Sequence, residues 1–427
     1  MNSFGEMNAV SSALAGDKPR RIRTDLLTGA ADRLPVGDAA AMTLASLQQY
    51  GAEHEHWALA WSGGKDSTAI LTLIVYFIAA GLLKPPKSLT IFYADTRQEL
   101  PPLQAAANLI IAKLRDLGIR VEVVMAPIDD RFLVYILGRG VPPPSNTFRW
   151  CTGQIKVEPM AAALIPRIEE IDGNILMITG VRQGESAVRD ARIAMSCSKD
   201  GGECGQGWYQ QVLPESKAVN GRIATLAPLL HWRVCSVWDW LKIFAPMQQY
   251  GAWPTAILAD AYGGDEAEEI NARTGCIGCP LVDKDKALAA IVAMPGWDHL
   301  RPLLRIKAVY RALRLPRNRL KKTGINADGS IAKAKNKQRM GPLTFEARLW
   351  ALEAILTIQR EVNEAAAVLG RPGVDMLNAE EEARIRELIA AKTWPNGWAG
   401  DEPRADTPMP AVYADGSVQP LLGIFGS

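Results

Sequence analysis

The sequence predicts an α/β fold built on a doubly wound, mostly parallel sheet, followed by a cysteine-rich segment and a helical C-terminal extension. Short apolar runs of strand length alternate with helical patterns, and a glycine-rich turn stands where the first run meets a helix. A helix between two strands crosses the sheet and returns the chain in the same direction. This alternation therefore makes neighbouring strands parallel.

The individual elements follow from the spacing of apolar residues. A partly ordered lead-in is expected over residues 1–35, because no strong period appears there. Helical patterns occupy 38–51, 69–83, 101–117 and, in the extension, 343–368; strand patterns end at Trp61 and cover 88–96, 120–126 and 175–180. The alternation of the two kinds of element is regular up to residue 180.

Composition places the chain among ordinary globular proteins. Its 427 residues suffice for two domains, and 48% hydrophobic with 22% charged residues is typical of such proteins. A net charge of +2 predicts no partner by itself. The start has no basic region before a long apolar stretch, and the most apolar helix, about 69–83, is too short to span a bilayer. We therefore expect a cytoplasmic protein without a membrane partner.

The glycine-rich turn has the features of a phosphate cradle. Glycines let backbone N–H groups approach an anion, the following helix offers its positive end, and a lysine and two serines add a charge and hydroxyl donors. The alternative is a strand-to-helix turn without a ligand. The cradle residues are Ser62, Gly63, Gly64, Lys65, Asp66 and Ser67.

Two more stretches follow predicted strands and carry charge. Asp95 ends the strand that contains Tyr93, where open α/β sheets bind their ligands. The strand 175–180 runs into a GVRQGES motif, whose arginines suit phosphate charge. This motif could instead form a surface ion-pair array. Its candidate residues are Gly180, Arg182, Glu185 and Arg189.

Five of the six cysteines are candidates for metal or sulfur chemistry. Cys276 and Cys279 form a CxxC pair, a spacing that suits zinc, an iron–sulfur cluster or a redox pair. The others are Cys197 and Cys204 in a glycine-rich loop, and Cys151 in an RWCT stretch with Arg149 before it and Lys156 after it. Cys151 could instead be a buried structural thiol, and Cys235 is predicted to lie in the core.

A basic segment follows the CxxC pair. Residues 301–340 contain thirteen Lys or Arg and one acid, Asp328. Such a run can bind nucleic-acid phosphates without reading bases, and its end, 324–341, is predicted to be a mobile arm. The alternative is a solvated face.

Together these motifs resemble those of a known family. SGGKDS is similar to the PP-loop of the ATP pyrophosphatases, which are related to the sulfonucleotide reductases. SGGKDS, RWCT, GVRQGES and CIGCP in this order resemble the DndC-like ATP pyrophosphatases of DNA phosphorothioation systems, to which SspD-type proteins are related. The likeness spans about residues 55–310. It implies a PP-loop, adenine nucleotide alpha hydrolase-like fold and a 4Fe–4S cluster held by four of five cysteines: Cys151, Cys197, Cys204, Cys276 and Cys279.

The resemblance also implies a domain division and a reaction. A PP-loop domain would cover 36–245, the cluster-bearing segment with the basic arm 246–342, and the helical extension with its tail 343–427. The protein would use ATP and Mg²⁺ to adenylate a DNA backbone phosphate, release pyrophosphate and allow sulfur to enter. A cysteine desulfurase would supply the sulfur, alongside other phosphorothioation proteins, and a homo-oligomer is possible.

The resemblance also suggests roles for single residues. Lys65, Asp66, Arg182 and Cys151 would be catalytic. The nucleotide would be bound by the cradle together with Tyr93, Asp95, Arg149, Gly180, Arg182 and Arg189. A nearby metal, or the cationic Arg149 and Arg182, would lower the pKa of the attacking thiol.

Three other functions stay open at this stage. A sulfonucleotide reductase is expected to have a degenerate loop, whereas SGGKDS is complete. A tRNA-thiolating enzyme would use the same adenylation chemistry and fits the basic segment equally well. A nucleotide- and cluster-binding DNA regulator is the alternative that is not an enzyme, and it would release no pyrophosphate.

Overall fold

The computed structural model describes residues 36–183, 208–212, 222–263, 275–326 and 328–421. The chain divides into two compact units, which are described separately below. Unit 1 comprises 1–95, 100–124 and 160–274, and unit 2 comprises 96–99, 125–159 and 275–427.

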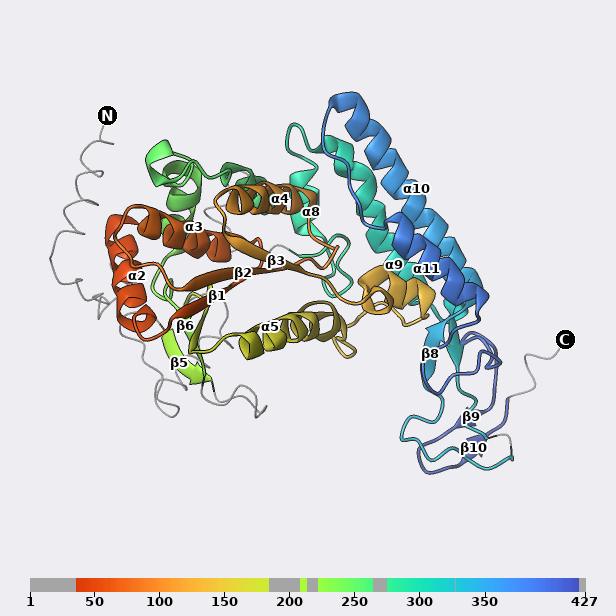
Figure 1. Ribbon diagram of the computed structural model, residues 1–427. Coiled ribbons are helices and arrows are strands. Elements are labelled where there is room, and N and C mark those ends of the chain that lie inside the picture. Colours follow the sequence, from red (N-terminus) through yellow and green to blue (C-terminus); the bar gives the residue numbers. More distant parts are fainter. Residues whose placement is uncertain (1–35, 184–207, 213–221, 264–274, 327, 422–427) are drawn as a thin grey trace, which may run out of the picture. The chain divides into compact units, whose positions relative to one another are not determined.

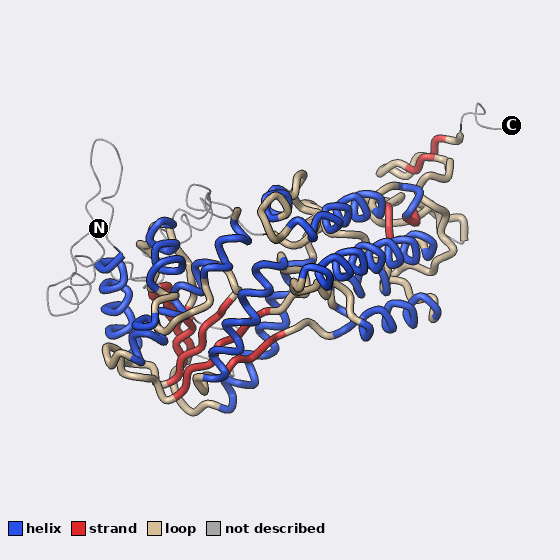
Figure 2. Tube along the Cα trace, turned by 90° about the horizontal axis from the view of Figure 1, so that it is seen from above, coloured by secondary structure: helices blue, strands red, loops and turns tan. Residues whose placement is uncertain are grey.

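Unit 1 is built on a six-stranded sheet in the order β3-β2-β1-β4-β6-β5. Five strands run parallel, and β5 pairs antiparallel with β6 at the edge. Figure 2 shows the strands lying side by side. The strands are β1 (His56–Trp61), β2 (Ser88–Ala94), β3 (Arg120–Val124), β4 (Ile175–Ile178), β5 (Trp208–Val212) and β6 (Ile223–Ala227). The predicted doubly wound, mostly parallel α/β sheet is confirmed.

Helices cover both faces of this sheet (Figure 1). On one face lie α3 (Lys65–Ala79) and α4 (Pro101–Asp116), which begins with prolines at its first two positions, where no N–H is needed. On the other face α5 (Glu158–Glu170) packs Ile168 into a core cluster with Phe92 and Ile175. Further helices are α2 (Val36–Gly51) and α7 (Val234–Asp239).

The strand order creates a switch point beside β1. The chain leaves β1 through α3 to reach β2 on one side, whereas β4 lies on the other side. The two connections diverge at the carboxyl ends of β1 and β4, and open α/β sheets bind their ligands in such a crevice. The glycine-rich turn after β1 stands at this position.

Unit 2 is mainly helical in its described residues. It contains α8 (Lys286–Ile291), α9 (Ile306–Leu313), α10 (Phe345–Leu369) and α11 (Ala379–Ala390), with the short pairs β7 (Arg319–Lys321) with β8 (Met340–Leu343) and β9 (Ala411–Val412) with β10 (Val418–Gln419). The predicted helical extension is therefore present. Within the described residues, no helix is long and apolar enough to cross a membrane.

The basic segment, including part of the predicted arm 324–341, makes defined contacts. The Gln338 side chain donates to the carbonyls of Thr323 and Pro410, at 2.9 and 2.7 Å. Lys322 and Arg339 lie over the ring of Trp398, at 4.6 and 5.6 Å from its centroid. The C-terminal tail therefore folds onto the basic segment and holds it through hydrogen bonds and cation–π contacts.

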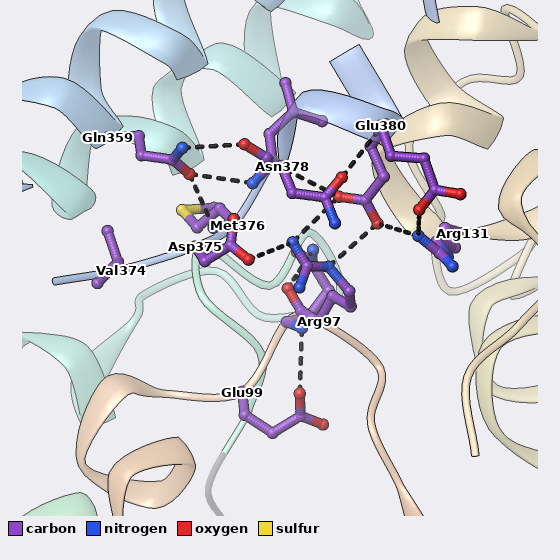
Figure 3. A network of polar contacts seen from close by, with 12 residues as sticks. Arg97, Glu99, Arg131, Gln359, Val374, Asp375, Met376, Asn378 and Glu380 are labelled. Carbon is purple, nitrogen blue, oxygen red and sulfur yellow. Dashed lines mark hydrogen bonds and ion pairs between the residues drawn. The ribbon is translucent and has the colours of Figure 1, made fainter. Parts of the chain in front are cut away.

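A network of charges joins the loop after β2 to α11 (Figure 3). Glu381, whose side chain is 3% exposed, forms ion pairs with Arg97 at 3.1 Å and with Arg131 at 3.4 Å. It also completes the capping box of α11 with Asn378. One buried carboxylate thus balances two cations and caps a helix.

We expect Glu381→Gln to lower the free energy of unfolding by about 3 kcal/mol, because both arginines lose a buried counter-charge. Glu380→Gln is the matched control, since Glu380 pairs with Arg131 at 3.1 Å but is 65% exposed. Its effect should stay within about 0.5 kcal/mol. Urea unfolding measures both variants, and equal losses would contradict the role given to Glu381.

Candidate functional site

The turn after β1 has the backbone of a cradle. Gly63 has φ +72°, in the left-handed region that glycine adopts without strain. A Cβ at this position would lie 3.3 Å from Cε2 of Tyr93. The α3 helix begins at Lys65, four residues earlier than the predicted 69. The positive N-terminal end of the helix is therefore part of the cradle.

The two cradle serines bond to each other and to the turn. The hydroxyls of Ser62 and Ser67 lie 3.0 Å apart, and the Ser67 hydroxyl donates to the Gly64 carbonyl at 3.2 Å. The Ser62 N–H donates to the Ser67 hydroxyl at 3.2 Å. These bonds fix the turn before any ligand arrives, while the Ser62 side chain stays on the exposed rim.

Three charges meet at the base of the cradle. Asp66 accepts from Arg182 Nε at 2.5 Å through Oδ1 and contacts Lys65 Nζ at 3.1 Å through Oδ2. The side chains are only 4–13% exposed. Both oxygens of Asp66 thus face cations, so the residue suits a water-mediated contact with Mg²⁺ rather than direct coordination. The structure brings these three predicted catalytic residues together.

Two further residues of the site carry no recognisable motif. The Tyr262 hydroxyl accepts from the Lys65 N–H at 3.1 Å, and its ring lies 5.0 Å from Lys65 Nζ. The Trp232 carbonyl accepts from Arg182 Nη1 at 3.2 Å. Tyr262 and Trp232 come from separate parts of the chain, and only the fold brings them to the cradle. The sequence offered no signal for either.

Gly180 follows β4 and lies directly against the cradle backbone. A Cβ here would approach the Ser67 nitrogen to 2.6 Å and the Asp66 carbonyl carbon to 2.7 Å. Only glycine lets the β4 end and the start of α3 come this close. The predicted nucleotide-binding residue therefore has a packing role that the sequence did not reveal.

The other nucleotide-binding candidates of unit 1 lie in different surroundings. Tyr93 is 1% exposed and packs at a tilt of 43° against Trp61, with ring centroids 5.0 Å apart, and its ring lies against Gly63 of the cradle. Asp95 is half-buried at the end of β2, and its N–H donates to the Val124 carbonyl at 2.9 Å. Arg189 and Glu185 lie outside the described residues.

Three of the candidate cysteines share one environment in unit 2. Cys151, Cys276 and Cys279 lie close enough to influence one another electrostatically, and the charges of Arg149 and Lys156 act on this group. Cys197 and Cys204 lie outside the described residues, and Cys235 is half-buried in unit 1.

The CxxC turn is held by helix α9 and by one aspartate. Gly278 has φ +62°, and a Cβ there would lie 2.7 Å from Cγ2 of Ile306. Its N–H donates to Asp285 Oδ2 at 2.9 Å, while Lys307 Nζ donates to the Cys279 carbonyl at 2.9 Å. The glycine between the two thiols is therefore required by both backbone conformation and packing.

Two of the three thiols have raised pKa values. Burial raises the pKa of Cys276 to about 12, and the Glu99 carboxylate adds to the rise. Burial also raises the pKa of Cys151, and the lowering of that pKa by Arg149 is smaller. Arg182 binds Asp66 and is not among the groups that act on Cys151.

The thiols of unit 2 do not form a complete metal site with the described residues. In that part of the chain, no three Cys, His, Asp or Glu side chains converge on a point that could hold a metal ion. The donors are nevertheless soft thiols, as iron and zinc prefer. The buried Tyr310 hydroxyl, which interacts with Cys276 and Cys279, has no hydrogen-bond partner among the described residues. The environment therefore matches the chemistry of a thiol-bound centre, while the ligand set is incomplete in these residues.

Comparisons with known proteins agree with the fold. Residues 56–243 match the family described as the phosphoadenosine phosphosulfate (PAPS) reductase domain. A comparison with curated proteins found no match.

Solved structures show only distant likeness. A PAPS reductase from Candida auris in a phosphate complex is 13% identical, with 47% of this chain and 77% of that chain covered and a TM-score of 0.30. The Candida glabrata FMN adenylyltransferase with FMN and an ATP analogue is 14% identical, with 55% and 64% covered and a TM-score of 0.32. The U34-tRNA thiolase NcsA from Methanococcus maripaludis with its 4Fe–4S cluster is 15% identical, with 69% and 84% covered and a TM-score of 0.31. These scores are too low to support a functional argument. Residues 56–243, which include the cradle, are thus similar to the PAPS reductase domain.

Proposed function

We propose that the protein is an ATP pyrophosphatase that adenylates a DNA backbone phosphate and thereby allows sulfur to replace a non-bridging oxygen. The observation that carries this proposal is the complete SGGKDS cradle at the switch point, with Lys65, Asp66 and Arg182 gathered at its base. A cradle of this kind binds the pyrophosphate part of ATP as a leaving group.

Adenylation provides the leaving group that the replacement of oxygen by sulfur requires. Oxide is too poor a leaving group at neutral pH for direct displacement. In the first step a phosphate oxygen of DNA attacks the α-phosphorus of ATP, and the bond to pyrophosphate breaks. A sulfur nucleophile then attacks the activated DNA phosphorus, and AMP leaves with the former phosphate oxygen. One oxygen is lost from DNA, and one sulfur takes its place.

The cradle residues have distinct tasks in this mechanism. Backbone N–H groups and the positive end of α3 hold the β and γ phosphates. Lys65 turns from Asp66 to the incoming phosphates, while Arg182 keeps Asp66 in place. When bound, Mg²⁺ would neutralise charge on the departing pyrophosphate. Lys65 therefore leaves the Asp66 carboxylate when ATP binds.

Sulfur delivery falls to the candidate cysteines. Cys276 and Cys279, with two of Cys151, Cys197 and Cys204, would hold a 4Fe–4S cluster, which would bind or donate sulfur. A cysteine desulfurase would supply the sulfur, and the remaining cysteine would carry it as a persulfide. After the outer sulfur has attacked phosphorus, a second thiol would cleave the S–S bond, which releases the phosphorothioate and leaves a disulfide.

The direct test is pyrophosphate release from ATP. We expect Lys65→Met to reduce release by about 100-fold or more, because it removes a preorganised cation from the leaving group. Lys87→Met is the control, since Lys87 is exposed and pairs only with Glu55 in the described residues. Equal release by wild type and Lys65→Met would contradict the assignment.

A second experiment identifies the acceptor. Deleting the protein from its host should remove phosphorothioate from digested genomic DNA. Unchanged DNA phosphorothioate with loss of thionucleosides from tRNA would assign tRNA as the acceptor instead. Release of sulfite from a sulfonucleotide, without pyrophosphate, would indicate a reductase.

A further inference from the structure

Unit 2 contains a cavity that the reaction above does not use. It has a volume of about 440 Å³, within the range of small-molecule and nucleotide sites. Its walls come from the turn before β7, the first turn of α10 and the C-terminal tail. The lining residues are Arg317, Asn318, Leu320, Thr344, Phe345, Glu346, Trp394, Gly400 and Arg404.

The walls of this cavity are firmly connected. Leu320 of β7 forms a β-bridge with Arg404 of the tail. The Lys321 N–H donates to the Pro403 carbonyl at 2.9 Å, and the Ala405 N–H donates to the Arg319 carbonyl at 2.7 Å. The tail therefore runs as an extra strand beside β7 and closes one side of the cavity.

Positive charge at the cavity surface exceeds negative charge. Arg317 is exposed and forms no ion pair with any described residue, whereas Arg404 pairs with Asp406 at 3.2 Å. Glu346 is the acid that lines the cavity. The exposed guanidinium of Arg317 is thus available to an anion that enters.

A buried arginine adds charge behind the aromatic wall. Arg348 is 0% exposed, and its guanidinium stacks on Trp394 and Phe345, at 4.4 and 4.7 Å from the ring centroids. It donates to the carbonyls of Thr393 and Leu343, at 2.8 and 3.1 Å. No described carboxylate acts on Arg348, whose pKa shift has burial as its cause, and its Nη2 lacks a hydrogen-bond partner among these residues.

Arg348 lies behind the wall, since it is not among the residues that line the cavity. Burial lowers its pKa to about 9, so it remains protonated at neutral pH. A buried cation without a carboxylate partner is costly, and an anion bound nearby reduces that cost. The first turn of α10, capped by Thr344, presents the positive end of a 25-residue helix to the same cavity.

We propose that this cavity binds a backbone phosphate of a nucleic-acid strand, with Arg317 as its principal contact and Arg404 as a second. The choice of nucleic acid rests on the proposed function and on the composition of residues 301–340, which contain thirteen basic residues and one acid. The site would anchor the strand by its backbone and read no bases.

Fluorescence anisotropy of a labelled single-stranded DNA with the full-length protein, without ATP, tests the proposal. Arg317→Ala should raise the dissociation constant about tenfold or more, as expected for one hydrogen bond to a charged group, and reduce the slope of log K against log salt by about 0.7. Arg404→Ala should act in the same direction with a smaller effect. The matched control is Arg301→Ala, because Arg301 is an exposed arginine of the same basic segment outside the cavity lining.

The outcomes separate the alternatives. A clear loss for Arg317→Ala with a small loss for Arg301→Ala would support the site. Equal losses would mean diffuse attraction by the basic segment and would overturn it. A second experiment titrates the protein with inorganic phosphate. If phosphate binds wild type but not Arg317→Ala, and DNA binds neither protein, the cavity is a site for free phosphate. This result would overturn the nucleic-acid assignment. Because binding is measured without ATP, failure of pyrophosphate release and failure of this site remain distinguishable.

Discussion

Asp66→Asn is expected to lower the free energy of unfolding by about 3 kcal/mol and to reduce pyrophosphate release. Asparagine keeps the shape of the side chain but removes the negative charge that two buried cations share, and loss of such a charge is strongly destabilising. Arg182 lies 2.5 Å and Lys65 Nζ 3.1 Å from the two carboxylate oxygens. Urea unfolding and a pyrophosphate assay on the same preparation measure the two effects.

Glu55→Gln provides the control for Asp66→Asn. Glu55 also pairs with a lysine in unit 1, Lys87, at 2.8 Å, but both side chains are more than half exposed. Solvent screens such a pair, so the change in stability should stay within about 0.5 kcal/mol and release should be unaffected. If Asp66→Asn were as mild as Glu55→Gln, the three charges would not form the base of the cradle.

Gly180→Ala should damage the cradle from the neighbouring strand. The added methyl group would lie 2.6–2.7 Å from backbone atoms of Asp66 and Ser67, which cannot move as a flexible side chain could. We expect a loss of about 2–3 kcal/mol in stability, as for overpacking in a tight contact. We also expect a large fall in pyrophosphate release, because the cradle must shift.

Gly81→Ala distinguishes this effect from the cost of losing a glycine. Gly81 follows α3 with φ +71°, and no atom lies within 4 Å of a Cβ built there. Backbone strain alone should cost about 1 kcal/mol, with pyrophosphate release unchanged. Normal release by Gly180→Ala would show that the contact with the cradle has no functional role.

The local elements were largely predictable because each has its own pattern. The runs before Trp61 and at 88–96, 120–126 and 175–180 became β1 to β4, since short apolar runs suit buried parallel strands. The start of α3 was placed too late because Lys65 and Asp66 read as cradle rather than helix. The apolar stretch at 223–227, which forms β6, carried a strand signal that was not assigned.

The site was predictable only where one motif contains its parts. SGGKDS identified the cradle, and GVRQGES identified Arg182, although not its bond to Asp66. Tyr262 and Trp232 could not be found, because nothing in their surroundings indicates a role. The raised pKa of Cys151 could not be predicted, since the degree of burial that raises a pKa depends on packing by distant segments.

The sequence by itself determined the strand–cradle–helix unit, the parallel sheet and the residue types available for phosphate and sulfur chemistry, because these depend on local period and spacing. The tertiary structure alone decided which distant residues meet. It placed Gly180 against the cradle, joined Asp66 to Arg182, gathered Cys151 with Cys276 and Cys279, and enclosed Arg348 behind an aromatic wall. Such contacts arise when the whole chain buries its apolar surface, so no short stretch of sequence encodes them. The SGGKDS cradle was visible in the sequence, whereas the partners that hold its charges became visible only in the fold.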